Sequence, residues 1–424
     1  MSMTLSIKQA VALIAAQVRN LKADTATALI GAPGVGKSSA LAAVFRDMVR
    51  EKGGVFLGWE ADDRLIVTDP PAGEGFVLDT SDPVAPVVTS GSPYLSYVHA
   101  FMPGCSPGMI RGILVPQPGA SHGGRPGQVS ASWSRPGILA GLPDKAERCV
   151  VVLDELAKAP EMFSMAASLV HGGRAGVHQL PGDSRHAVVL SNAGEHRAGA
   201  RDMTMDLINR LTVIDVVADP TSDRAWARAQ GKPAWALAVA SSSVGEDLIY
   251  RSAIPDRNKP FASPRSWWAA VDALSAILVG GPDDLPPADH PVVQAVLAGR
   301  LGDDAADKIL TWLARALDIP AIDEILADPS GTAIPERPDM VLYVAEVVAR
   351  VLLDQSTDAK ERAAKVKAAL IYIDRLPEIG QIAVVGVFDA MRKDVKSTNI
   401  LLKALHEFPV LRGIWSKHGS LLIS

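Results

Sequence analysis

The chain has 424 residues, of which 48% are hydrophobic and 21% are charged, and its formal net charge is −5. The apolar content excludes a disordered chain, and the length is enough for two or three domains. The acidic balance argues against a surface that is basic throughout, although a local basic lining stays open. The two cysteines, Cys105 and Cys149, exclude a disulfide scaffold and a cysteine zinc site.

The first predicted element is an amphipathic helix with apolar residues at helical spacing, namely Ile7, Val11, Ile14, Val18 and Leu21. Residues 10–16 also resemble the apolar core of a signal peptide, but they lack a basic leader and polar residues follow at once. No apolar run in the sequence approaches the ~20 residues that span a bilayer. We therefore expect a helix docked on a core, and a cytoplasmic protein with no membrane partner.

A strand is predicted at residues 26–30, followed by a glycine-rich loop and a helix at 39–50. From about 53 to 136 the chain is rich in Gly, Pro, Ser and Asp. We expect this stretch to be one or two insertions with irregular or hairpin structure. Its short strand-like pieces are residues 55–59, 65–67 and 86–89.

Regular structure is predicted to resume with a strand, a helix, a glycine-rich hairpin and two further strands, at residues 149–153, 161–170, 172–183, 186–190 and 212–217. Apolar strands that alternate with helices are typical of a parallel sheet covered on both faces. The expected fold class is therefore α/β, with a parallel sheet sandwiched by helices.

The rest of the chain is predicted to be helical, with helices at 340–353 and 359–376 among others. A break rich in Pro, Asp and Gly at 280–291 indicates a linker. We therefore expect three domains: an α/β core at 1–218 that contains the insertion, a helical lid at 219–280, and a helical C-terminal domain of unknown role at 292–424.

Residues 31–38 match the phosphate-loop pattern GxxxxGK[ST] in full, between a predicted strand and a predicted helix. The glycines allow backbone N–H groups to face phosphates, and the helix N-terminus adds positive potential. Lys37 would reach the β- and γ-phosphates, and the Ser38 hydroxyl would ligate Mg²⁺. The motif predicts binding of ATP with Mg²⁺ by Gly31, Pro33, Gly34, Val35, Gly36, Lys37, Ser38 and Ser39.

Two acids, Asp154 and Glu155, follow the strand predicted at 149–153. The carboxyl edge of a parallel sheet is where its ligand binds. Asp154 would hold Mg²⁺ through water, and Glu155 would orient and polarise the attacking water. A solvated acidic turn is the alternative for this pair alone, and the phosphate loop favours the functional interpretation.

Three further residues are candidates for contact with the phosphates. Asn192 follows the strand at 186–190, where its amide can touch the γ-phosphate or the water, and a turn-forming Asn is the alternative. Arg210 precedes the strand at 212–217, and Arg265 opens a helix after Pro264. Each arginine can serve as a phosphate-facing cation, one in trans from a neighbouring subunit and one in cis from a lid.

The phosphate loop and four later segments together resemble the MoxR-like branch of the AAA+ ATPases, a group common in phages and bacteria. Those segments are DELAKAP (154–160), SNAGEH (191–196), INRL (208–211) and SPRSWW (263–268). The likeness covers roughly residues 5–275. It implies a P-loop AAA+ sheet and an active homo-oligomeric ring, usually a hexamer, that hydrolyses ATP at its subunit junctions.

The resemblance also implies roles for individual residues. Lys37 and Ser38 lie in Walker A, and Asp154 and Glu155 lie in Walker B. Asn192 looks like sensor 1, Arg210 like the arginine finger and Arg265 like sensor 2, and the competing candidates for the trans arginine are Arg197 and Arg201.

Family members commonly act with a partner that carries a von Willebrand factor A domain, to remodel or mature other proteins. The resemblance therefore favours a protein client, and the hairpin at 172–183 would face the pore or that client. The chain departs from the family in two places. The stretch between Lys37 and Asp154 is longer than the family core needs, and Ala157-Lys158 stands where the family usually has Asn-Arg.

Two other functions stay open at this point. A nucleic-acid motor or loader in phage replication, packaging or defence would need a basic pore lining, and nucleic acid would stimulate its ATPase. A nucleotide-gated scaffold would assemble with ATP and turn over negligibly. The nucleotide-site motifs are the same in all three cases. The nine histidines show no ligand spacing, so no catalytic metal other than Mg²⁺ is expected.

Overall fold

The computed structural model divides the chain into two compact units, Met1–Ala218 and Asp219–Ser424. The residues that it describes are 4–21, 23–60, 62–117, 130–192, 202–250, 259–277, 285–353, 359–382, 384 and 407–418. Each unit has its own hydrophobic clusters.

The first unit is built on an eight-stranded sheet. Its strands, in spatial order, are β1 (Thr4–Ser6), β14 (Thr212–Val217), β2 (Thr25–Gly31), β13 (Ser184–Asn192), β10 (Arg148–Asp154), β7 (Leu95–Phe101), β3 (Gly54–Leu57) and β4 (Arg64–Val67). All neighbouring strands pair in parallel except β4, which is antiparallel to β3. The predicted α/β class with a mostly parallel sheet is therefore confirmed.

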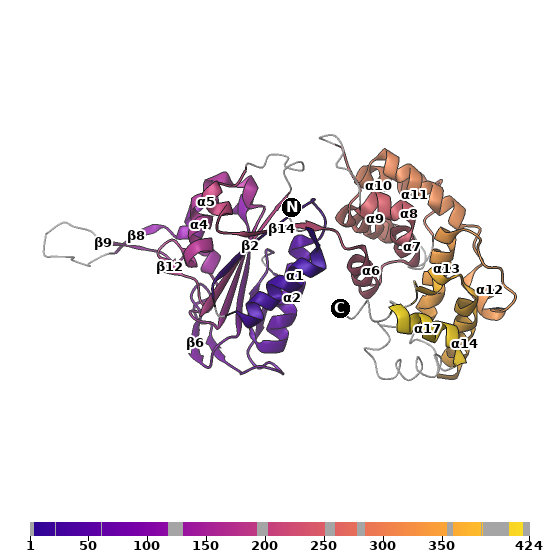
Figure 1. Ribbon diagram of the computed structural model, residues 1–424. Coiled ribbons are helices and arrows are strands. Elements are labelled where there is room, and N and C mark those ends of the chain that lie inside the picture. Colours follow the sequence, from indigo (N-terminus) through magenta and orange to yellow (C-terminus); the bar gives the residue numbers. More distant parts are fainter. Residues whose placement is uncertain are drawn as a thin grey trace. The chain divides into compact units, whose positions relative to one another are not determined.

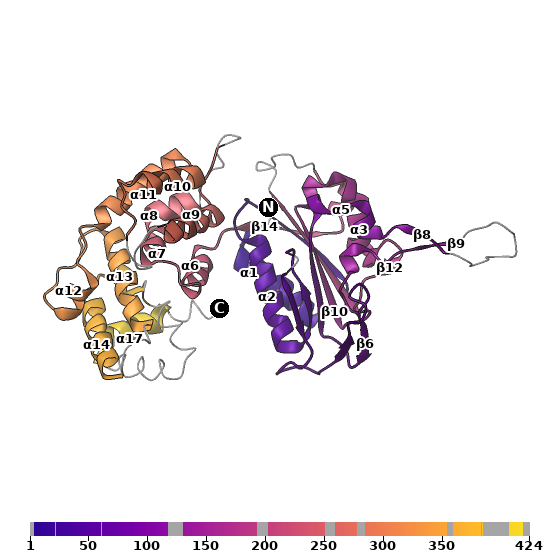
Figure 2. The same ribbon diagram turned by 180° about the vertical axis from the view of Figure 1, so that it is seen from behind.

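Helices cover both faces of this sheet (Figures 1 and 2). One face carries α1 (Ile7–Asn20) and α2 (Lys37–Lys52), and the other carries α4 (Phe163–Gly172) and α5 (Met205–Ile208). Side chains of β10 alternate between the two cores, because successive residues of a strand point to opposite faces. This double burial explains why the strand is apolar along its length.

Helix α1 begins where its sequence predicts. Ser6 accepts a hydrogen bond from the backbone N–H of Gln9, and the Gln9 side chain accepts one from the backbone N–H of Ser6. This capping box satisfies two N–H groups that a helix start otherwise leaves without partners. The apolar residues predicted to face the core, Ile7, Val11 and Ile14 among them, are buried.

The expectation that residues 53–136 form only insertions is wrong. Strands β3 and β7 lie within this stretch, and both belong to the central sheet. Strand β7 is buried along most of its length, yet it contains Ser96 and His99, which break the apolar pattern on which the prediction relied. Polar side chains are tolerated inside a sheet when tertiary partners satisfy them, and His99 has such partners.

Additions to the sheet within this stretch are smaller than expected. One is the hairpin β5 (Val77–Asp79) and β6 (Val87–Ser90), another is the short helix α3 (Pro107–Arg111), and the third is the pair β8 (Leu114–Gln117) and β9 (Ser130–Trp133). The pair β8–β9 projects away from the sheet (Figure 1). The hairpin expected at 172–183 is present as β11 (Arg174–Ala175) and β12 (His178–Gln179), which pair antiparallel.

In its described part, the second unit is helical. Its helices are α6 (Pro220–Ala229), α7 (Ala234–Ser241), α8 (Ser243–Gly245), the π-helical turn η6 (Glu246–Tyr250), α9 (Pro264–Ile277), α10 (Pro291–Leu301), α11 (Asp303–Ala316), α12 (Ile322–Ala327), α13 (Pro338–Leu353), α14 (Ala359–Arg375) and α17 (Pro409–His418). Among the described residues, none of the helices is long and apolar enough to cross a membrane.

One hydrophobic cluster of the second unit combines side chains from both sides of the linker expected at 280–291. Trp235 and Trp267 come from the expected lid, and Trp312 and Tyr343 come from the expected C-terminal domain. A second cluster joins α12, α13 and α14. The first of these clusters is therefore shared by the two regions that the sequence predicts to be separate domains.

Candidate functional site

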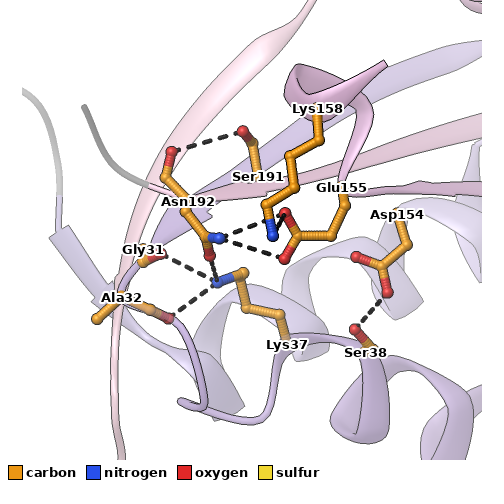
Figure 3. Close-up of polar contacts among 9 residues, drawn as sticks. All are labelled: Gly31, Ala32, Lys37, Ser38, Asp154, Glu155, Lys158, Ser191 and Asn192. Atoms are coloured by element: carbon orange, nitrogen blue, oxygen red, sulfur yellow. Dashed lines mark hydrogen bonds and ion pairs between the residues drawn. The ribbon is translucent and has the colours of Figure 1, made fainter. Parts of the chain in front are cut away.

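Three neighbouring strands bring the predicted site residues to one edge of the sheet. Strand β2 leads into the phosphate loop, β13 ends at Asn192, and β10 ends at Asp154. The register aligns Asn192 with Gly31 and Asp154 with Leu190. Because the strands are parallel, their carboxyl ends meet at the same edge, and the side chains that follow them converge there (Figure 3).

The phosphate loop depends on glycine at specific positions. Gly34 and Gly36 have φ angles of 81° and 88°, in the left-handed region that favours glycine. At Gly31 a Cβ atom would lie 2.3 Å from the carbonyl oxygen of Val216, so the neighbouring strand β14 excludes a side chain there. Pro33 and Val35 complete the loop, and Ser39 lies in the first turn of α2.

Lys37 begins α2 and its side chain turns back over the loop. Its Nζ donates to the carbonyl oxygens of Gly31, at 3.0 Å, and Ala32, at 2.9 Å. It also donates to Oδ1 of Asn192 at 3.3 Å (Figure 3). The ammonium group is buried at the sheet edge, beside the positive end of the α2 dipole. This concentration of positive potential suits an anionic ligand.

Asp154 is held by two donors that meet the same carboxylate oxygen. The Ser38 hydroxyl donates to Oδ2 at 2.6 Å, and Nε2 of His99 lies 3.0 Å from Oδ2. Burial raises the pKa of Asp154, but the hydrogen bonds from His99 and Ser38 and the charge of Lys37 outweigh it and leave the pKa below its ordinary value. The group is therefore a carboxylate at neutral pH.

Glu155 has an unusual backbone conformation. Its φ of 55° makes it, among the described residues, the only non-glycine residue with a positive φ, and the 3₁₀ turn η3 (Leu156–Lys158) starts after it. Nδ2 of Asn192 donates to both carboxylate oxygens of Glu155, at 3.2 and 3.3 Å. The ammonium of Lys158 lies 3.1 Å from Oε2 (Figure 3). Non-glycine residues with a left-handed backbone, such as Glu155, cluster at functional sites.

The oxygen atoms at this edge fit a magnesium ion. The Ser38 hydroxyl and the Asp154 carboxylate are in contact, and Mg²⁺ prefers oxygen ligands. Across the described part of the chain, no group of three or more His, Cys, Asp or Glu side chains is arranged to hold a metal by itself. Magnesium at nucleotide sites uses one or two protein ligands together with phosphate oxygens and water, so this small donor set fits it.

The structure thus brings together Lys37, Ser38, Asp154, Glu155 and Asn192. The two predicted arginines are not part of this contact network. Arg210 is exposed just after α5 and forms an ion pair with Asp206 at 2.9 Å. Arg265 is exposed in α9 of the second unit. The competing candidates Arg197 and Arg201 lie outside the described residues.

Two contacts at the site were not predicted from the sequence. His99 contacts Asp154 from β7, and Lys158 contacts Glu155 from the following turn. A single histidine within the strand sequence LSYVHAF was the only signal for the first. For the second, the spacing of three residues between Glu155 and Lys158 was visible, but the conformation that brings the two together was not.

No protein-family model matches the chain, and no curated protein matches it either. Solved structures with some likeness include the ORC2 protein of Aeropyrum pernix in complexes with ADPNP and ADP, with 13% identity and a TM-score of 0.32 over 95% of this chain and 84% of that one. NtrX of Brucella abortus has 14% identity and a TM-score of 0.32 over 95% and 67%. The Hsp104–ADP complex of S. cerevisiae has 12% identity and a TM-score of 0.25 over 99% of this chain and 48% of that one. At these identities and TM-scores, none of the likenesses assigns a function to this chain.

Proposed function

We propose that this protein binds ATP with Mg²⁺ and hydrolyses it, as a ring-forming ATPase of the MoxR-like AAA+ type. The observation that carries the proposal is the convergence at one sheet edge of a complete phosphate loop, a Ser38–Asp154 oxygen pair and a carboxylate, Glu155, bound to Asn192. A phosphate cradle alone supports binding, whereas an acid beside it also supports activation of water.

In this proposal the loop and Lys37 bind the phosphates. Lys37 exchanges its present acceptors, the oxygens of Gly31, Ala32 and Asn192, for β- and γ-phosphate oxygens. Ser38 and Asp154 hold Mg²⁺, which when bound neutralises phosphate charge. Asp154 is suited to this because it is ionised at neutral pH.

Glu155 is the group that accepts a hydrogen bond from the attacking water and polarises it. Its Oε2 already contacts Asn192 and Lys158, whereas Oε1 contacts Asn192 alone, so Oε1 keeps an acceptor position for water. Asn192 contacts both Lys37 and Glu155. When a phosphate binds Lys37 and displaces Asn192 from it, the contact between Asn192 and Glu155 changes as well. Asn192 thereby suits the role of a residue that senses the γ-phosphate.

The arginines complete the site in the assembled protein. Arg210 is exposed in the first unit, where it can reach the γ-phosphate held by a neighbouring protomer. Arg265 would act in cis from the helical unit, so that the position of this unit would depend on which nucleotide is bound. The resemblance to MoxR-like proteins supports a hexameric ring that remodels or matures a protein client, and it implies a partner that carries a von Willebrand factor A domain.

The test compares two variants of the full-length protein for binding of a fluorescent ATP analogue and for phosphate release. Lys37→Ala should lose nucleotide binding, whereas Glu155→Gln should bind ATP with near-normal affinity and release no phosphate above background. Normal ATP binding by Lys37→Ala would contradict the phosphate-loop assignment. Normal turnover by Glu155→Gln would remove Glu155 from the chemistry, and a wild-type protein that binds but never hydrolyses would favour the nucleotide-gated scaffold.

A further inference from the structure

His99 is a buried polar residue next to the proposed magnesium site, and none of the roles above uses it. Its side chain is 1% exposed, and it lies in the middle of β7, next to β10 in the sheet. Nε2 lies 3.0 Å from Oδ2 of Asp154, and Nδ1 lies 3.2 Å from the hydroxyl of Tyr97. A buried imidazole with a partner at each nitrogen has a fixed orientation.

The partners also determine which nitrogen carries the proton. The carboxylate of Asp154 only accepts, so Nε2 of His99 must be the donor toward it. In an imidazole with one N–H, Nδ1 then accepts a hydrogen bond from the Tyr97 hydroxyl. Burial and then the charge of Asp154 raise the pKa of Tyr97, which keeps that hydroxyl protonated.

Tyr97 is itself fixed by aromatic packing. Its ring is stacked on Phe56, with centroids 4.5 Å apart and an interplanar angle of 1°, and it contacts Phe45 at 5.4 Å. Phe56 belongs to β3 and Phe45 to α2, and all three rings are buried in the core. The row of hydrogen bonds from Tyr97 through His99 to Asp154 is therefore anchored by a ring that is packed rigidly in the core.

This row of hydrogen-bonded side chains fixes the orientation of the Asp154 carboxylate. His99 and Ser38 both bind Oδ2, and the other carboxylate oxygen points away from Ser38 (Figure 3). Among the described residues, no hydrogen bond reaches Oδ1. A serine hydroxyl can bind a cation through its oxygen and still donate its proton, so His99 and Ser38 together hold Asp154 in one rotation while Oδ1 stays available.

We propose that His99 is a positioning residue of the magnesium site: by donating to Oδ2 of Asp154 it holds the carboxylate so that Oδ1 faces the metal or a water bound to it. The inference rests on the proposed function, because it assumes that Asp154 serves Mg²⁺. It adds that Mg²⁺ affinity is set in part by two residues of β7, His99 and Tyr97. Partners in such outer positions typically change metal affinity about 10–100-fold when removed.

The test measures binding of a fluorescent ATP analogue to the full-length protein, first in EDTA and then during a titration with MgCl₂. His99→Leu removes the donor and puts an apolar side chain of similar size in its place, so binding in EDTA should stay within about twofold of wild type. Mg²⁺ increases the affinity for the ATP analogue, and the Mg²⁺ concentration that gives half of this increase should be about 10–100-fold higher in His99→Leu than in wild type. His99→Gln is the matched control, because its amide N–H reaches about as far as Nε2, and it should restore most of the loss.

A purely structural role for His99 gives a different pattern. Binding in EDTA and binding with Mg²⁺ would then fall together, with a lower unfolding temperature, and that result would overturn the inference. An unchanged Mg²⁺ half-point in a folded His99→Leu protein would overturn it as well. If His99→Leu fails to fold, Tyr97→Phe decides: it removes only the hydroxyl that orients His99, so a smaller shift in the same direction supports the proposal and no shift overturns it.

The same titration separates this inference from the proposed function. A wild-type protein that fails to bind the analogue, or that gains nothing from Mg²⁺, contradicts the proposed ATP·Mg²⁺ site and the inference with it. A wild-type protein with a clear Mg²⁺ gain, unaltered in the His99 and Tyr97 variants, leaves the proposed function intact and contradicts the inference alone.

Discussion

Lys158 contacts one oxygen of Glu155, the carboxylate that is proposed to polarise water. Its ammonium lies 3.1 Å from Oε2 of Glu155, in a partly exposed position. An ion pair of this kind contributes up to ~1 kcal/mol. The left-handed backbone of Glu155 is strained, so its present position depends on the contacts that surround it.

We predict that Lys158→Met raises basal ATP turnover by up to about fivefold, since this is the factor that corresponds to ~1 kcal/mol. ATP affinity should not change, because Lys158 makes no contact with the phosphate loop that the structure records. Lys158→Arg keeps the charge and is the control, with turnover near wild type. Steady-state phosphate release checks this, and a fall in turnover for Lys158→Met would show instead that the ion pair orients Glu155 productively.

His186 carries a pH dependence of stability. It is buried in β13, where its Nδ1 lies 2.7 Å from the Thr25 hydroxyl. Burial, reinforced by the charge of Arg148, lowers its pKa from 6.5 to about 4, although Asp24 acts in the opposite sense. The unfolded chain therefore takes up a proton at a higher pH than the folded protein does.

We predict that the free energy of unfolding falls as the pH is lowered from about 6.5 toward about 4, because in that window protonation favours the unfolded chain. His186→Asn keeps an amide near the Thr25 hydroxyl but does not titrate. Urea unfolding at pH 7 and pH 5 should show a larger loss of stability for wild type than for this variant. Equal losses in the two proteins would remove His186 as the cause.

At the scale of elements, a buried ion pair joins α6 to α13. Nε of Arg228 donates to Oε2 of Glu346 at 3.1 Å, and the second guanidinium nitrogen, Nη2, contacts Oε1, so the pairing uses both carboxylate oxygens. The Glu346 side chain is only 3% exposed. Removing one member of a buried pair leaves the other charge without compensation, at a cost of about 3–5 kcal/mol.

We therefore predict that Glu346→Gln lowers the free energy of unfolding of the helical unit by about 3–5 kcal/mol. Glu361→Gln is the matched control, because Glu361 pairs with Lys365 on the exposed surface of α14, where the effect should stay below ~1 kcal/mol. Urea denaturation followed by circular dichroism measures both. Similar losses in the two variants would mean that the buried pair adds no more than a surface pair.

At the scale of the whole molecule, the proposal requires that one protomer completes the site of the next. Lys37→Ala should lack nucleotide but keep Arg210, whereas Arg210→Ala should bind nucleotide but lack the arginine. Each protein alone should have little activity. In a mixed ring, some junctions combine an intact phosphate loop with an intact Arg210.

We predict that mixing these two inactive variants in equal amounts restores a measurable fraction of wild-type phosphate release, whereas each remains inactive alone. Mixing Lys37→Ala with Glu155→Gln is the control, and there the gain should be absent, because Glu155 acts on the nucleotide of its own protomer. A mixture that stays inactive would contradict a trans role for Arg210, and wild-type activity in Arg210→Ala alone would move that role to Arg197 or Arg201.

A different experiment at this scale asks what the proposed ATPase acts on. The Glu155→Gln protein, held with ATP and Mg²⁺, can be recovered from a lysate of its source with whatever it binds. A stoichiometric protein would support the remodelling of a client. Nuclease-sensitive DNA or RNA without a protein partner would favour the nucleic-acid motor, whose ATPase should also depend strongly on salt.

Local patterns in the sequence were enough to predict the α/β class, the helix α1 with its buried face, and the phosphate loop between β2 and α2. These predictions succeed because helical and strand periods, and the glycines of a tight loop, act over a few neighbouring residues. Strand β10 was equally visible, since burial on both faces makes it apolar throughout. The roles assigned to Asp154, Glu155 and Asn192 remain proposals.

Tertiary structure alone decided which strands are neighbours. It placed β7 beside β10, and with it the contact of His99 with Asp154, although 55 residues separate the two in the chain. It also joined Asn192 to both Lys37 and Glu155. Strand order and register depend on how whole faces of the sheet pack against helices, and no local pattern in the sequence encodes that. The partner of a polar residue such as His99 is therefore known only when the sheet is assembled.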